Sequence, residues 1–152
     1  MKPARLHLML LALGLSVQMP ALAGHPVDEP LPMVGTAEHG HAYPGAIVPF
    51  GMVQVSPDTR IDTWDGCSGY HFSDTVIRGF SHTHLAGTGC GCLGDVLIMP
   101  TVGELRLEAG TPGGGYSSHF AHAKEKATPG YYRVFLEDPG VTVEPAGVQG
   151  TG

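Results

Sequence analysis

Glycine and proline interrupt this sequence more often than regular helices tolerate. There are 23 glycines and 13 prolines in 152 residues, and beyond residue 23 they break nearly every apolar run. Glycine destabilises a helix interior through backbone entropy, and proline does so through a lost hydrogen bond. The apolar runs that remain are short, so the sequence predicts a fold of strands and turns.

Six of these short runs are rich in the β-branched and aromatic residues that favour strands. They are Ile47–Val55, Val76–Phe80, Val96–Met99, Glu104–Leu107, Tyr131–Leu136 and Val141–Val143. Val134 and Leu136 alternate with Arg133 and Phe135, as in a strand with one buried face, and an Asp-Pro-Gly turn follows at 138–140. The sequence predicts an all-β fold, an antiparallel β-sandwich over residues 24–144, followed by an unstructured tail at 145–152.

The first 23 residues have the order of a secretory signal peptide. Lys2 and Arg5 precede an apolar run from Leu8 to Val17, and small residues at 21 and 23 favour cleavage after Ala23. The run is too short for a membrane anchor, and no later stretch is long and apolar enough to be one. We expect export of the mature chain to the periplasm or the medium, with no membrane partner.

The charge of the chain argues against a nucleic-acid partner. The formal net charge is −6, and removal of Lys2 and Arg5 with the signal peptide subtracts two cations to give −8. Between Val34 and Pro100 the only cations are Arg60 and Arg78. A basic surface for a phosphate-rich polymer is therefore not expected.

Three cysteines, an odd number for an oxidising compartment, suggest one disulfide and one free thiol. Cys90 and Cys92 are too close in sequence to pair well with each other. Pairing of Cys67 with Cys90 or with Cys92 is the expectation, and the sequence leaves the choice open. The Cys-Gly-Cys spacing also differs from that of thioredoxin-like redox sites.

Two histidine pairs have the same spacing, His39 with His41 and His82 with His84. On an extended strand this spacing directs both rings to one face, so two such pairs could bind a transition metal. The alternative is that they line a polar cleft or make hydrogen bonds within loops. The glycine-rich run at 87–91 lacks the lysine of a phosphate-binding loop, and its glycines fit left-handed backbone or close approach to another surface.

Carboxylates gather around Trp64, the single tryptophan, in company with Arg60. A flat aromatic ring beside hydrogen-bonding groups suits a sugar, which has an apolar face and a rim of hydroxyls. Trp64 as a packing anchor among turn residues is the alternative. Glycoside hydrolysis needs two carboxyl groups, but spacing selects no pair from Glu38, Asp58, Asp62, Asp65, Asp74 and Asp95.

Three strings in order carry a family resemblance: VGTAEHGHAYPGAIVPFGMVQVSPDTR from Val34, WDGCSGYHFSD from Trp64 and GFSHTHLAGTGC from Gly79. Together they resemble the start of family 92 glycoside hydrolases, which are secreted or periplasmic, calcium-dependent, inverting exo-α-mannosidases. Cys92 departs from the pattern, since a polar or acidic residue is expected there, and VDEPLPMVGT replaces a tighter opening string.

The resemblance implies an N-terminal β-sandwich that packs on a larger (α/α)₆ barrel, with the active site between them. The general acid, the general base and the calcium site would come mainly from the barrel, which this sequence lacks. The N-terminal loops would close one wall of the mannose pocket, through His39, His41, Trp64, Asp65, His82 and His84. The chain would then be a domain or fragment of an α-mannosidase acting on α-mannoside glycans, without catalytic residues of its own. The alternatives are a carbohydrate-binding or interaction module without catalysis and a small metal-binding β protein.

Overall fold

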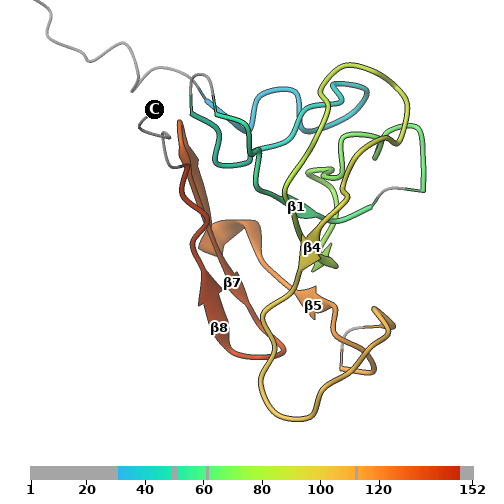
Figure 1. The fold of residues 1–152 in the computed structure, drawn as a ribbon, viewed down its shortest axis with the longest axis vertical. Coiled ribbons are helices and arrows are strands. Elements are labelled where there is room, and N and C mark those ends of the chain that lie inside the picture. The colour runs from blue at the N-terminus through green and yellow to red at the C-terminus, as the bar shows by residue number, and fades with distance from the viewer. Residues whose placement is uncertain (1–30, 49–50, 61, 112, 148–152) are drawn as a thin grey trace, which may run out of the picture.

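The computed structural model of the protein describes residues 31–48, 51–60, 62–111 and 113–147, so the predicted signal peptide lies outside the described residues. The described chain is built from short strands joined by long loops (Figure 1). The strands are β1 (Ser56–Asp58), β2 (Val76–Ile77), β3 (Gly79–Ser81), β4 (Leu97–Ile98), β5 (Ser118–His119), β6 (Glu125–Thr128), β7 (Tyr131–Leu136) and β8 (Val141–Val143). A short 3₁₀ helix, η2 (His122–Lys124), precedes β6, and none of the helices in these ranges could cross a membrane.

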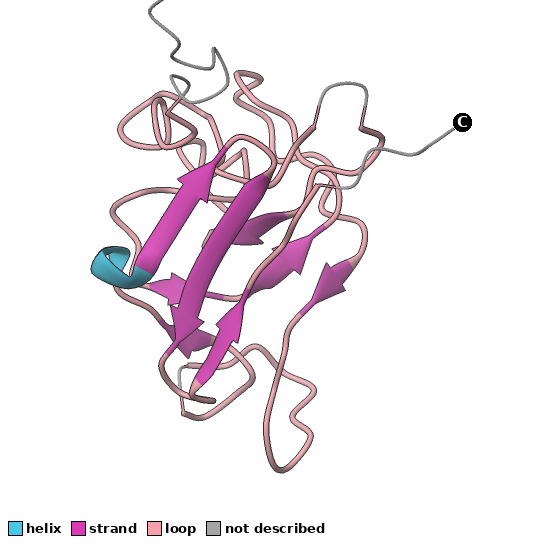
Figure 2. Ribbon diagram, turned by 90° about the vertical axis from the view of Figure 1, so that its left-hand side faces the viewer, coloured by secondary structure: helices cyan, strands magenta, loops and turns pink. Residues whose placement is uncertain are grey.

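In the described part of the chain, all strand pairs are antiparallel and form three small sheets. One sheet has the order β6-β7-β8, a second has the order β1-β3-β4, and β2 pairs with β5. The β6-β7-β8 sheet forms one layer, and the shorter strands lie behind it (Figure 2). The long loops that follow β1 and β3 gather at the end of the molecule away from β5 (Figure 1).

The hydrophobic core lies between these layers. Strand β7 buries Tyr132, Val134 and Leu136 completely, while Ile77 and Phe80 are buried on the strands behind. Alternate residues of β7 thus face the core, as the sequence pattern predicts. Two packed antiparallel layers with an apolar interior confirm the predicted β-sandwich.

The strand predictions were right where alternation and turn chemistry agree. Tyr131–Leu136 and Val141–Val143 are strands with the predicted bounds. The predicted segments at 76–80 and 96–99 contain β2, β4 and the first two residues of β3, which ends at Ser81. Ile47–Val55 and Glu104–Leu107 were wrong for their described residues. In the first, only Val55 pairs, in an isolated bridge with Ala46, and residues 49 and 50 lie outside the described residues. The second lies in an exposed loop. Strand β6 was missed because only Thr128 of its Glu-Lys-Ala-Thr sequence favours strands, and pairing with β7 holds it.

The predicted unstructured tail begins too early. Ala146 forms a β-bridge with Tyr131, and the Gly147 amide donates to the carbonyl of Gly130 at 2.8 Å. Residues 145–147 therefore continue the pairing of β8 with β7 as far as the start of β7. Residues 148–152 lie outside the described residues.

A buried carboxylate joins the strands to the loop that follows β1. Glu125 accepts hydrogen bonds from the hydroxyl of Tyr132 at 2.5 Å, from that of Tyr70 at 3.0 Å, and from the ring of His122 at 2.7 Å. Burial, together with the charge of Glu125, raises the pKa of both tyrosine hydroxyls well above the usual value. The two hydroxyls are therefore held in their neutral, donating form.

This network predicts a loss of stability in alkali. A tyrosine in an unfolded chain has a pKa of about 10, and the pKa values of Tyr70 and Tyr132 in the folded chain are higher. The stabilisation is thus fully present below about pH 10 and is lost above it, by at most about 1.4 kcal/mol per pH unit for each tyrosine. Urea unfolding between pH 9 and 11 measures the slope, and Tyr70→Phe should make it shallower. An unchanged slope in Tyr70→Phe would contradict this account.

Candidate functional site

Four of the six predicted pocket residues come together at the loop end of the molecule. The rings of His39 and His41 lie 5.1 Å and 4.3 Å from the ring of Trp64, and the His39 Nδ1 donates to Asp65 Oδ1 at 2.6 Å. We call His39, His41, Trp64 and Asp65 the Trp64 cluster. Trp64 is 57% exposed, so one side of the indole is open to solvent.

The polar residues of the Trp64 cluster differ in their hydrogen bonding. The hydrogen bond from His39 lowers the pKa of the Asp65 carboxyl below its usual value, so this exposed group is an anion at neutral pH. His41 is buried, and its Nε2 atom has no hydrogen-bond partner. Its ring meets the indole edge to face, at 88°. The cluster therefore presents an aromatic surface, an anionic acceptor and a buried imidazole nitrogen.

The glycine-rich loop after β3 packs directly against the indole. A Cβ atom on Gly89 would lie 2.7 Å from Trp64 Nε1, and the backbone of Gly89 has a φ of +70°. The Gly87 amide donates to the carbonyl of His41 at 2.8 Å. Glycine is thus required at 89 by both space and conformation, which confirms the predicted use of these glycines for close approach.

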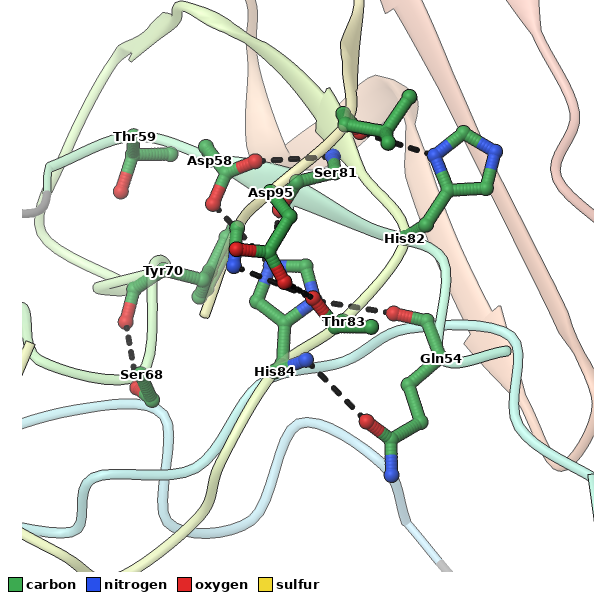
Figure 3. Close-up of polar contacts among 12 residues, drawn as sticks. Gln54, Asp58, Thr59, Ser68, Tyr70, Ser81, His82, Thr83, His84 and Asp95 are labelled. Carbon is green, nitrogen blue, oxygen red and sulfur yellow. Dashed lines mark hydrogen bonds and ion pairs between the residues drawn. The ribbon is translucent and has the colours of Figure 1, made fainter. Parts of the chain in front are cut away.

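His84, a fifth predicted residue, is buried beneath this loop end. Its Nε2 atom lies 3.1 Å from Asp58 Oδ1 and 3.0 Å from Ser81 Oγ, and its Nδ1 atom lies 2.9 Å from the carbonyl oxygen of Gln54 (Figure 3). The other Asp58 oxygen accepts the Ser81 amide at 2.9 Å. These bonds tie β1 to β3 and fix the start of the loop that carries Gly87 and Gly89.

The Asp58, Ser81 and His84 side chains do not form a catalytic triad. In a triad the serine and the carboxylate contact different ring nitrogens, so that the histidine can relay a proton. Here both contact Nε2, and Nδ1 must donate because the Gln54 carbonyl only accepts. The geometry fits a structural anchor rather than a nucleophilic centre.

His82, the sixth predicted residue, points away from His84 (Figure 3). Its Nδ1 donates to the carbonyl of Val96 at 2.8 Å, outside the Trp64 cluster. The assumption that each histidine pair lies on an extended strand was wrong, since His41 has a φ of +49° and His82 to His84 follow the end of β3. The two pairs therefore do not converge on a metal.

Calcium in the intact enzyme, which the resemblance implies, stays a prediction. The described ranges contain no group of three or more histidine, cysteine, aspartate or glutamate side chains that could hold a metal ion. Calcium prefers six to eight oxygen ligands, and the carboxylates of Asp58, Asp65 and Asp74 are already engaged by His84, His39 and Arg60. No step is assigned to calcium in this chain.

A cavity of about 290 Å³ lies beside His84 and Asp58. Its wall includes Cys67, Cys92 and Leu97, whereas Cys90 is not among the lining residues. All three cysteines are free thiols in the structure, Cys67 buried and the other two exposed. The predicted disulfide therefore stays a prediction, but the two candidate partners of Cys67 differ in position.

We expect a linkage between Cys67 and Cys92 when the protein is oxidised, because these two residues face one cavity. Oxidised glutathione would take the two electrons and two protons of the thiols and leave as two reduced molecules. Peptide mapping without reductant checks the pairing. The linkage should survive Cys90→Ser and vanish in Cys92→Ser. A linkage of Cys67 to Cys90 would contradict the expectation.

The sequence analysis did not identify the residues that hold His84 in place. Gln54 and Ser81 hold His84, and neither has a sequence signal beyond lying near a strand end. Asp58 was considered only as one of several acids. The grouping of Trp64 and Asp65 with His39 and His41 was foreseen only through the family resemblance.

Comparisons with known proteins agree with that resemblance. Residues 31–152 match the Glycosyl hydrolase family 92 N-terminal domain. A family 92 alpha-mannosidase from Bacteroides thetaiotaomicron, solved in complex with mannoimidazole, is similar over 81% of this chain, with 46% identity and a TM-score of 0.75. A second, inverting family 92 mannosidase from the same organism is similar over 72% of the chain, with 27% identity and a TM-score of 0.52.

A relative from Arthroderma benhamiae, described as an uncharacterized secreted glycosidase, is 30% identical over 115 residues, which are 74% of this chain. The chain spans only 14% of that relative and 17% of the first Bacteroides mannosidase. What is shared is therefore the N-terminal part of much longer proteins. The chain belongs to glycosyl hydrolase family 92 and carries its N-terminal domain.

Proposed function

We propose that this chain supplies one wall of the mannose pocket of an exported α-mannosidase, through the Trp64 cluster. The observation that carries the proposal is the open indole of Trp64, flanked by an anionic acceptor and imidazole rings. A pyranose has an apolar face that fits an aromatic ring and hydroxyls that donate to a carboxylate. The similar Bacteroides mannosidase was solved with mannoimidazole.

In this proposal the chain binds and orients the sugar but performs no proton transfer. Hydrolysis needs a general acid and a general base or nucleophile, one on each side of the glycosidic bond. We expect these groups in the barrel domain that the resemblance implies, so the catalytic pair would come from the rest of a family 92 enzyme. Trp64 and Asp65 would limit the orientations of the terminal mannose.

A chimera tests this division of labour. Residues 34–147 replace the aligned part of the Bacteroides mannosidase, which is 46% identical. We expect the chimera with calcium to hydrolyse an aryl α-mannoside, and the 152-residue chain alone to show no turnover. Removal of an acid or base lowers rates by about 10²–10⁴-fold each. Turnover by the isolated chain, or a folded but inactive chimera, would contradict the proposal.

Export is part of the same proposal, and it rests on the signal-peptide pattern and on the secreted relative. Mass spectrometry of the protein recovered from the periplasm or medium should find Gly24 as the first residue. Recovery of a soluble cytoplasmic protein that retains Met1 would contradict export without affecting the mannose-pocket proposal.

A further inference from the structure

Exposed apolar side chains concentrate in one segment, residues 93–107. Seven of the fifteen large apolar side chains exposed in the described part of the chain lie there, with exposed fractions from 43% to 80%. They are Leu93, Val96, Leu97, Ile98, Val102, Leu105 and Leu107. We call this segment the apolar edge. Single exposed apolar residues are ordinary on a protein surface, but seven within one segment of fifteen residues mark a candidate interaction site.

The apolar edge includes a strand with a free side. Strand β4 pairs with β3 through Ile98 with Phe80 and Leu97 with Ser81, and it ends the order β1-β3-β4. Within the described ranges no strand pairs with its other side. After β4 the chain runs away from the body as an open loop (Figure 1). An unpaired apolar strand of this kind is a template for another β-segment.

The apolar edge continues into the cavity beside His84. Leu93 and Leu97 line that cavity together with Ala109 and Tyr116, so apolar walls lead inward from the exposed strand. Charges along the edge are few: Asp95, Glu104 and Arg106 are the charged residues of 93–107. A partner would be recognised by apolar contact and backbone pairing rather than by charge.

The failed strand prediction at Glu104–Leu107 now has a physical reason. Leu105 and Leu107 alternate with Glu104 and Arg106, which is the period of a strand with one buried face. In the structure both leucines are exposed and no strand forms. A segment with strand periodicity but no partner is the expected result when the covering strand comes from outside the described chain.

We propose that the apolar edge binds an extended β-segment from the part of a family 92 polypeptide that this chain does not share. The relatives have the length for such a segment, since the aligned region is only 17% of the Bacteroides mannosidase and 14% of the fungal protein. The segment pairs with the free side of β4 and carries alternating apolar side chains that cover Leu105 and Leu107. This contact lies apart from the Trp64 cluster and does not depend on its role in sugar binding.

Co-expression tests the proposal. The partner is the Bacteroides mannosidase without its aligned region, and the bait is the tagged 152-residue chain. We expect a one-to-one complex by light scattering, with slower hydrogen exchange at residues 95–107. Leu105→Asp combined with Leu107→Asp should lower the recovered complex by about tenfold or more, because burial of two charges costs more than the roughly 1.4 kcal/mol that a tenfold change requires.

Met52→Asp is the matched control, since Met52 is 93% exposed and lies outside the apolar edge. It should leave the complex intact. Leu105 and Leu107 are 75% and 80% exposed, so their replacement should leave the circular dichroism and Tm of the chain unchanged. Equal recovery of the complex with the double variant would overturn the proposal, as would the absence of a complex with the folded wild type. It would also be overturned if the wild type formed a homodimer and the double variant were monomeric.

Discussion

Replacing Trp64 with alanine in the chimeric mannosidase should lower kcat/KM by about tenfold or more while leaving Tm almost unchanged. Trp64 is 57% exposed, so the fold loses little packing without it. A sugar that stacks on the ring would lose apolar burial and roughly 0.5–1.5 kcal/mol of ring interaction, and about 1.4 kcal/mol corresponds to tenfold in rate. A fully buried tryptophan, by contrast, contributes about 3–5 kcal/mol to folding.

Two matched variants separate the roles of Trp64. Trp64→Phe keeps a flat apolar face and should retain much of the activity. Phe72→Ala removes an aromatic ring that is 42% exposed and stacks on His122, outside the Trp64 cluster, so kcat/KM should be unaffected. Steady-state kinetics and thermal unfolding of each variant give the comparison. A large fall in Tm with normal kcat/KM in Trp64→Ala would identify the residue as a core anchor.

The strands could be predicted where the residue pattern of the strand itself determines its position. β7 and β8 follow from alternation, an intervening turn and a shared core, all within Tyr131–Val143. β5 and β6 could not be predicted, because Ser118–His119 and Glu125–Thr128 are strands only through their partners. Local pattern specifies an element when its own apolar face decides its position, and fails when a neighbour decides it.

Four of the six predicted residues form the candidate site, and its geometry could not be predicted. Residue type and family resemblance brought Trp64, Asp65, His39 and His41 into one list. Their arrangement depends on the positive φ of His41 and on the close approach of Gly89, which no periodicity encodes. The same is true of His82 and His84, whose rings diverge once β3 has ended.

Asp58→Ala should be the most damaging single change to stability among the residues near the site. Asp58 and His84 are both buried, and the carboxylate accepts from the Ser81 amide at 2.9 Å and faces His84 Nε2 at 3.1 Å. Breaking a buried, hydrogen-bonded pair by removing one partner costs about 3–5 kcal/mol, since the remaining donors are left without an acceptor. We expect the free energy of unfolding, measured with urea, to fall by about 3 kcal/mol or more.

Asp95→Ala is the matched control. Asp95 lies in the loop between β3 and β4, and its side chain accepts an exposed hydrogen bond from Thr83 at 3.2 Å. Its effect should stay within about 0.5 kcal/mol, as for other surface substitutions. Asp58→Asn should fall between the two, since its amide oxygen can still accept from Ser81. A change below about 1 kcal/mol in Asp58→Ala would mean that His84 finds other partners, because the buried donors would then not need this carboxylate. Backbone pairing alone would then hold β1 against β3. The Trp64 cluster would not depend on the hydrogen bonds between Asp58, Ser81 and His84.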